Sequence, residues 1–287
     1  RARLNVDYTF DYPNGKLVLL TKAPFSIKVT AVIPDTNTIT INLFNPNQTN
    51  IEFNCEGSVL AFDWGDGTSS TEPHHQYSKI GRYNIVIGGN LEKIGVPPRF
   101  EKYIEYVVLG STVKSMLDGA FYVSDSLIAV DLMDAKNLKM ISHEAFEEDN
   151  NLESFILPST VETIGSGAFS SCYYIKPFLR DYKLNLVSIN MYAFSSCSAM
   201  DYVMLPSTLK SIGYGAFSRC SSLKIVDLTS FAKDTGVPSC EADAFEFCPS
   251  DLKFYFKDQD TLDNFANTDG WKKYSNSFVV GVPPKEI

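Results

Sequence analysis

The fold is decided by the stretch Met200-Asp-Tyr-Val-Met-Leu-Pro-Ser-Thr-Leu-Lys-Ser-Ile-Gly-Tyr-Gly-Ala-Phe-Ser-Arg-Cys220. Its Ala-Phe dipeptide recurs through the second half of the chain, and successive phenylalanines are 25, 23, 25, 23 and 28 residues apart. These phenylalanines are Phe121, Phe146, Phe169, Phe194, Phe217 and Phe245. A fixed period of roughly 20 to 50 residues is the sequence signature of stacked repeat proteins.

Each of these phenylalanines has similar neighbours. The residues five and eight positions before it are aliphatic or Met in the first five units, and apolar residues also follow at six, nine and eleven positions, where only Arg180 departs. A unit of this size cannot bury its own apolar face, so neighbouring units must stack. We therefore predict a solenoid over residues 101–249, mostly β with short helical or irregular turns. We expect tight, positive-φ or crowded positions at Gly165, Gly167, Gly213 and Gly215.

The repeated unit Leu-x-x-Val-x-Leu-Pro-Ser-Thr-Leu-x-x-Ile-Gly-x-Gly-Ala-Phe-x-x-Cys resembles the BspA-type leucine-rich repeat of bacterial surface proteins. Two departures stand out: Arg180-Asp-Tyr-Lys183 replaces the Leu-Pro-Ser-Thr turn, and Ser124 and Asp149 occupy the Cys position. Residues 250–287 are similar to the C-terminal cap of such arrays. A cap is needed because the last repeat would otherwise expose its stacking face.

Residues 23–95 follow a different pattern, with apolar residues alternating at a period of two. Short strands between turn clusters predict a small β-sandwich. The run Phe62-Asp-Trp-Gly-Asp-Gly-Thr68, followed by His75-Gln-Tyr77, resembles a PKD-like immunoglobulin-type domain. The resemblance implies a spacer module in front of the repeats. The expected fold is therefore an N-terminal immunoglobulin-like sandwich followed by a leucine-rich-repeat solenoid, and residues 1–22 receive no assignment.

The charge balance limits the partners. In 287 residues, 25 Lys and Arg stand against 34 Asp and Glu, a net charge of −9. Binding to nucleic acid or anionic membranes requires clustered positive charge, so we expect neither. The apolar run Leu17–Leu20 is too short to insert in a membrane. Because the chain opens at Arg1 rather than Met, we expect a trimmed form from which any export or anchor segment has been removed.

Catalytic and metal motifs are sparse. Asp63 and Asp66 with His74 and His75 suggest a metal site, but no further ligand has a suitable spacing, and an Asp-Gly turn explains the same residues. The sequence has no Cys-x-x-Cys, Gly-x-Ser-x-Gly or His-Glu-x-x-His motif. We expect no enzyme activity, metal or cofactor.

Four of the six cysteines follow a repeat phenylalanine by three residues, at Cys172, Cys197, Cys220 and Cys248. Equivalent positions of stacked coils point in parallel, which favours a ladder of buried thiols over disulfides. Cys240 and Cys248 are the pair for which a disulfide stays open.

Alternation along the repeat strands predicts which side chains point away from the core. Several are apolar or aromatic and suggest a partner-binding strip. The strip consists of Tyr106, Val108, Ile156, Leu179, Tyr202 and Met204. The alternative is that these are ordinary strand-forming residues scattered over the surface.

The resemblance implies a cell-surface or secreted bacterial protein that adheres to a host or cell-surface protein. The alternative function is glycan binding at the surface, for which aromatic side chains would stack on sugars. The aromatic candidates are Tyr12, Tyr122, Trp64 and Trp271, which are not grouped in the sequence.

Overall fold

The computed structural model describes residues 8–11, 16–19, 37–180 and 183–284. The chain forms two compact units, residues 1–33 and 34–287. In the first, β1 (Tyr8–Asp11) and β2 (Lys16–Leu19) pair as an antiparallel hairpin. Residues 23–36 of the predicted sandwich lie outside the described residues.

The second unit is almost entirely β. Its first elements are β3 (Asn37–Leu43), β4 (Asn50–Glu52), β5 (Asn54–Asp63), β6 (Ser69–Ser70), β7 (His74–Gln76), β8 (Gly81–Gly95) and the 3-10 helix η1 (Glu101–Tyr103). The repeat strands are β9 (Ile104–Val108), β10 (Ser115–Met116), β11 (Ala129–Asp131), β12 (Met140–Ile141), β13 (Ser154–Ile156), β14 (Thr163–Ile164), β15 (Ser188–Ile189), β16 (Tyr202–Met204), β17 (Ser211–Ile212), β18 (Ile225–Asp227) and β19 (Ser239–Cys240). The last elements are β20 (Lys253–Phe256), helix α1 (Gln259–Ala266), the 3-10 helix η2 (Lys272–Ser277) and β21 (Phe278–Val280).

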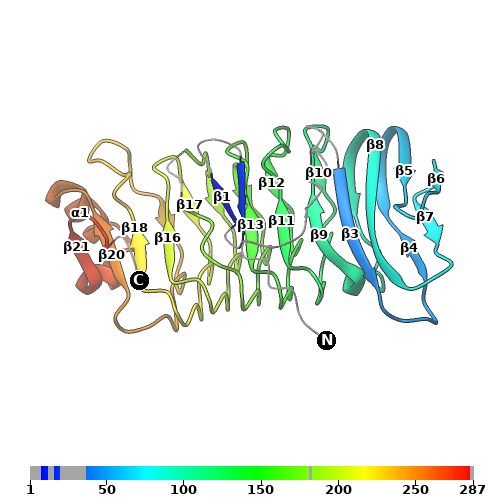
Figure 1. Ribbon diagram of the computed structural model, residues 1–287. Helices are drawn as coiled ribbons and strands as arrows, with labels where there is room; N and C mark the ends of the chain where they lie inside the picture. Colours follow the sequence, from blue (N-terminus) through cyan, green and yellow to red (C-terminus); the bar gives the residue numbers. More distant parts are fainter. Residues whose placement is uncertain (1–7, 12–15, 20–36, 181–182, 285–287) are drawn as a thin grey trace. The chain divides into compact units, whose positions relative to one another are not determined.

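The repeats stack as a solenoid, which confirms the predicted mostly-β array. Each coil has a two-residue strand on its back, and every coil except the one at residues 177–180 adds a strand to the front; all neighbouring strands of the array are parallel (Figure 1). The front strands form two groups, β9-β11-β13 and β16-β18-β20-β21, and the back sheet has the order β12-β14-β15-β17-β19. Its register places Ile141, Ile164, Ile189 and Ile212 in one row, one repeat apart.

The repeat phenylalanines form a continuous stack between the two sheets. Successive ring centroids from Phe121 to Phe245 are 5.4, 5.5, 5.2, 5.2 and 5.2 Å apart, with interplanar angles of 3° to 10°. All six rings are buried. Aromatic rings bury large apolar areas and gain from offset contact, so this stack supplies much of the cohesion between coils.

Each repeat phenylalanine lies between two residues with a left-handed backbone, one two positions before it and one two positions after it. Gly167 and Gly215, two residues before the ring, have φ of +64° and +60°. Gly165 and Gly213 have no positive φ but are crowded, since a Cβ atom would lie 2.7 Å from the carbonyl oxygen of Ile141 and 2.6 Å from a neighbouring backbone nitrogen, respectively. The expectation of positive-φ or crowded glycines is therefore correct at all four positions.

The front sheet is interrupted at residues 177–180. Pro177 lacks the N–H that a central strand would donate. Arg180 occupies the position where other repeats have an apolar residue, and it is exposed, whereas the preceding Leu179 belongs to the buried core. The chain thus places residue 179 inward instead of residue 180, and no strand forms here.

The described residues before the array form a sheet of β3, β8, β5 and β6, with the short pair β4–β7 as a second sheet. The larger sheet does not end at residue 95. Strand β3 pairs with β9 of the array, and β8 pairs in parallel with β10. The sheet is thus continuous across residues 95–101, where the sequence predicts a domain boundary. An immunoglobulin-like sandwich over residues 23–95 stays a prediction.

The last coil is covered by the C-terminal segment. The Trp271 ring is fully buried, its Nε1 donates to the Pro238 carbonyl at 2.7 Å, and its centroid lies 6.2 Å from that of Phe245. Tyr274 contacts the same phenylalanine edge-on at 5.5 Å. Among the described residues, no helix is both long and apolar enough to cross a bilayer.

Candidate functional site

The continuity of β3 with β9 creates one broad face that the sequence did not indicate. Strands β8, β3, β9, β11 and β13 lie side by side in one sheet, and their inward side chains are buried. The outward side chains align across the strands in two rows. The first row is Asn84, Thr40, Tyr106, Ala129 and Ser154, and the second is Val86, Thr38, Val108, Asp131 and Ile156. We call these ten residues the outer sheet face.

The side chains around Tyr106 are fixed by polar contacts. Arg82 Nε lies 2.7 Å from Glu105 Oε2, and Asn42 donates to the other oxygen of Glu105 at 3.0 Å. The Arg82 guanidinium carbon lies 5.2 Å from the centre of the Tyr106 ring. Beside them, Thr40 Oγ1 donates to Asn84 Oδ1 at 2.9 Å. A preordered arginine and tyrosine lose less side-chain entropy when a partner binds.

In the second row, Asp131 lies between Val108 and Ile156 in the register. Burial raises the pKa of the Asp131 carboxyl group, although the Met133 N–H, which donates to it at 2.9 Å, acts in the opposite direction. Apolar side chains thus flank a partly desolvated carboxylate. This mixture of apolar, aromatic and hydrogen-bonding groups is typical of protein interfaces.

The structure brings three of the six predicted strip residues together. Tyr106, Val108 and Ile156 are partly exposed on the outer sheet face. Tyr202 is also partly exposed but lies on β16, beyond the interruption of the front sheet. Its ring lies under the Arg180 guanidinium, with a distance of 5.3 Å, and its hydroxyl donates to Asp227 at 2.6 Å.

Leu179 and Met204 do not lie on an accessible strip, and the sequence prediction is wrong for both. They are only 1% and 6% exposed. Leu179 is buried because Arg180 cannot fill the inward position, so the leucine takes its place in the core. The Met204 N–H donates to the Leu179 carbonyl at 2.8 Å, which joins the start of this sheet to the coil before it.

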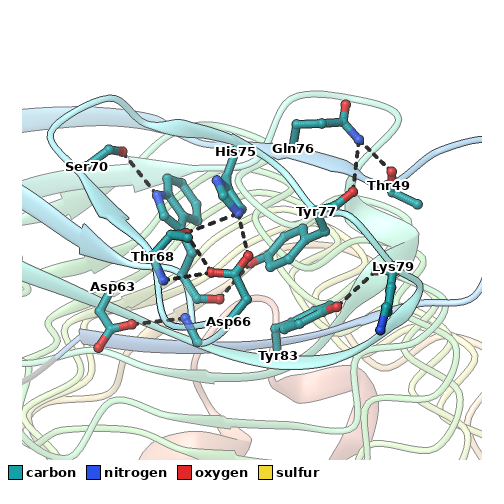
Figure 2. A network of polar contacts seen from close by, with 12 residues as sticks. Thr49, Asp63, Asp66, Thr68, Ser70, His75, Gln76, Tyr77, Lys79 and Tyr83 are labelled. Atoms are coloured by element: carbon teal, nitrogen blue, oxygen red, sulfur yellow. Dashed lines mark hydrogen bonds and ion pairs between the residues drawn. The ribbon is translucent and has the colours of Figure 1, made fainter.

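The Asp-Gly segment forms a turn, as the sequence indicates (Figure 2). Asp66 Oδ1 accepts from the Thr68 N–H and hydroxyl at 3.0 and 2.6 Å, while Oδ2 lies 2.9 Å from His75 Nε2. Burial acts to raise the pKa of Asp66, but the bonds from Thr68 and His75 outweigh it and lower the pKa to about 2. No group of three potential ligands suited to a metal ion occurs among the described residues.

Two aromatic side chains considered for sugar stacking are unavailable. Trp64 and Trp271 are 0% exposed. Trp64 stacks between Phe62 and His75, at centroid distances of 5.1 and 5.0 Å, and its Nε1 donates to Ser70. Tyr122 is 38% exposed, and Tyr12 lies outside the described residues.

The repeat cysteines form a ladder of thiols. The Sγ atoms of Cys172, Cys197 and Cys220 donate to phenylalanine carbonyls of the preceding coil at 2.9, 3.1 and 3.1 Å. Burial raises the pKa of each of these thiols well above the usual value. Cys240 and Cys248, the possible disulfide pair, are free thiols.

Sequence reasoning missed the part of the outer sheet face that precedes the array. Arg82, Asn84 and Val86 alternate with partly buried Tyr83 and buried Ile85 and Ile87, a signal that is present in the sequence. The predicted domain boundary at residues 95–101 separates this segment from the array, so alternation alone does not join the two.

Solved structures with likeness to this chain include a T. pallidum leucine rich repeat protein (29% identity, TM-score 0.39, 48% of this chain and 64% of that one). A leucine-rich repeat protein from Bacteroides ovatus shows 21% identity and a TM-score of 0.42 over 71% of this chain and 54% of that one. The pneumococcal vaccine antigen PcpA shows 18% identity and a TM-score of 0.28, over 68% of this chain and 72% of that one. The chain therefore spans less than two thirds of the first two proteins.

No curated protein matches the chain significantly. The profile of the BspA type leucine rich repeat region matches residues 74–179 and 179–267, in six copies, which together make up more than half of the chain. The match begins before the predicted start of the array at residue 101 and includes β8, which pairs with the first back strand β10. The chain belongs to the BspA type leucine rich repeat family.

Proposed function

We propose that this chain is a non-catalytic binding protein, secreted or held at a bacterial cell surface, which adheres to a protein partner through the outer sheet face. The observation that carries the proposal is the continuous alignment of outward side chains over five strands, from β8 to β13. We also propose the division into a PKD-like module at 23–95, repeats at 101–249 and a cap with its tail at 250–287.

A protein partner fits the chemistry of this face. Tyr and Arg are enriched at interfaces because they provide large contact areas together with hydrogen bonds. Tyr106 and Arg82 are in contact on the face, and Val108 and Ile156 add apolar area one row away. The regularly spaced strands form an extended surface, and repeat arrays use extended surfaces of this kind to bind partners.

The test is adhesion of the full chain to immobilised fibronectin, fibrinogen, laminin and collagen, measured by surface plasmon resonance. The variant Val108→Asp/Ile156→Asp places two charges on the outer sheet face. Thr163→Asp/Ser211→Asp is the matched control, because it adds the same charge to outward, partly exposed positions of the back sheet.

We expect at least one of these proteins to bind. The front-face variant should lose about tenfold or more in affinity, a change of about 1.4 kcal/mol, while the control should bind as the wild type does. Absence of binding to all four proteins, or equal binding by both variants, would count against the proposal. Circular dichroism and melting temperature check that both variants are folded.

A further inference from the structure

Two exposed tyrosines contact each other on successive coils, away from the outer sheet face. Tyr192 and Tyr214 are 40% and 37% exposed, and their rings meet edge to face, with centroids 5.4 Å apart and an angle of 89°. The backbone N–H of Tyr192 donates to the Tyr214 carbonyl at 2.9 Å, which fixes the two turns relative to each other. Met191, 47% exposed, precedes the first tyrosine. These side chains form a small open aromatic surface.

Tyr192 occupies a backbone position that disfavours it. It lies two residues before the repeat phenylalanine, where every coil has a positive φ. The residues at this position are Gly119, Glu144, Gly167, Tyr192, Gly215 and Asp243. Three coils have glycine, whereas Tyr192 has φ +56°, which is strained for a bulky residue. The side chain held in this conformation is partly exposed and contacts the next coil.

The next coil leaves room for the Tyr192 ring. A Cβ atom at Gly215 would lie 2.5 and 2.6 Å from Cε1 and Cδ1 of that ring. The ring therefore lies directly against the Gly215 backbone, and any side chain there would displace it. The Ser195 and Ser218 hydroxyls are hydrogen bonded 3.0 Å apart, and a Cβ atom at Gly215 would lie 3.3 Å from Ser218 Oγ. One face of the Tyr192 ring thus packs on the Gly215 backbone, and the Ser195 and Ser218 hydroxyls lie on the same two coils.

Two carboxylates act on the Tyr214 hydroxyl group. The pKa of the Tyr214 hydroxyl group is raised first by Tyr192, then by Asp243, burial and Glu246. The Asp243 and Glu246 carboxylates therefore lie near enough to act on this hydroxyl group. Asp243 also forms an ion pair with Lys273, whose Nζ lies 2.9 Å from Asp243 Oδ1. Such a surface repels sulfated or carboxylated ligands and accepts hydrogen bonds from neutral hydroxyl groups.

We propose that Tyr192 and Tyr214 form a binding site for neutral carbohydrate, in which a pyranose ring stacks on Tyr192 and contacts Tyr214. Tyrosine rings present an apolar face to the C–H groups of a sugar and a hydroxyl group to its oxygens. The nearby carboxylates and hydroxyls supply acceptors for sugar O–H groups. This site is separate from the protein-binding face and goes beyond the adhesion proposed above.

The test is isothermal titration calorimetry of the full chain with cellohexaose, chitohexaose and mannohexaose, and with a heparin hexasaccharide as the anionic probe. We expect one or more of the neutral oligosaccharides to bind and heparin not to bind. Tyr192→Ala/Tyr214→Ala should lose about tenfold or more in affinity. Tyr173→Ala/Tyr174→Ala is the matched control, since these tyrosines are 45% and 58% exposed, and it should bind as the wild type does.

Tyr192→Gly separates binding from folding. Because glycine relieves the positive φ, this variant should raise the melting temperature while it weakens sugar binding. The proposal is overturned if no neutral oligosaccharide binds the wild type, if only heparin binds, or if the Tyr173/Tyr174 variant loses affinity equally. Loss of matrix-protein binding by the Tyr192/Tyr214 variant, with no sugar bound by the wild type, would also overturn it and would assign the pair to a protein partner.

Discussion

The Oδ1 atom of Asp149 accepts a hydrogen bond from the backbone N–H of Ser124 at 2.6 Å, at the step of the array where later coils have cysteine. In the next coil, Cys172 Sγ donates to the Phe146 carbonyl. The other oxygen of Asp149, Oδ2, is buried and has no hydrogen-bond partner among the described residues. Asp149 therefore brings a buried carboxyl group into the row where the later coils have thiols.

Replacing this acid should change how stability depends on pH. Burial raises the pKa of Asp149 well above its usual value, with added repulsion from Glu101 and Asp125, although the Ser124 N–H acts in the opposite direction. A raised folded-state pKa means that the carboxyl group's stabilising contribution is complete below the unfolded pKa of about 3.9 and is lost as pH rises through the folded value. Asp149→Cys removes this loss. Urea unfolding should show it about 1 to 3 kcal/mol more stable than wild type at pH 8, with a smaller difference at pH 4.

Ser124→Cys is the control for this prediction, because it extends the thiol ladder without removing a carboxyl group. Its free energy of unfolding should follow the wild-type pH profile in shape. A wild-type profile identical to that of Asp149→Cys would mean that Asp149 is ionised in the folded protein.

The repeat was predictable and the front end of the array was not. The spacing of Phe121 to Phe245 identified the stack because each ring contacts its own equivalent one coil away, so local sequence determines the contact. The pairing of Thr40 with Tyr106 joins strands that are 66 residues apart, and no periodicity connects them. Leu179 is buried because the inward position shifts by one residue at Arg180, and the alternation of apolar residues does not predict such a shift. The predictions thus failed at a pairing between distant segments and at a local shift in the alternation.

The phenylalanine stack should be the main source of stability. Phe194 is fully buried and contacts two stacked rings, at 5.2 Å on each side. Phe194→Ala should lower the free energy of unfolding by about 3 to 5 kcal/mol, because it removes buried area and leaves a cavity. Phe247→Ala, at a 66% exposed position two coils further along, should cost less than about 1 kcal/mol. A comparable loss in both variants by urea unfolding would contradict the role of the stack.

Close stacking of the coils should make Gly165 intolerant of a side chain. A Cβ atom there would lie 2.7 Å from both Ile141 O and Ser142 C, which are backbone atoms and cannot move aside without shifting a coil. We expect Gly165→Ala to lower the melting temperature markedly, a loss of about 1 to 3 kcal/mol. At Gly81 the nearest atom would be 3.5 Å away, on the Tyr83 side chain, so Gly81→Ala is the matched substitution and should melt within a few degrees of the wild type.

The six cysteines should be protected from reagents while the protein is folded. Cys172, Cys197 and Cys220 are 0% exposed, and burial raises the pKa of Cys55, Cys240 and Cys248 to about 12. Only the thiolate reacts rapidly, so at pH 8 almost none is present. Dithionitrobenzoate should react slowly with the native protein, and unfolding in urea without a reductant should release six thiols, the full number in the sequence.

Release of four thiols would mean that two cysteines are joined in a disulfide. Peptide mapping would then show whether the bond is Cys240 to Cys248. Fast reaction in the folded state would show that the last coil opens, since two of the three less buried thiols lie there.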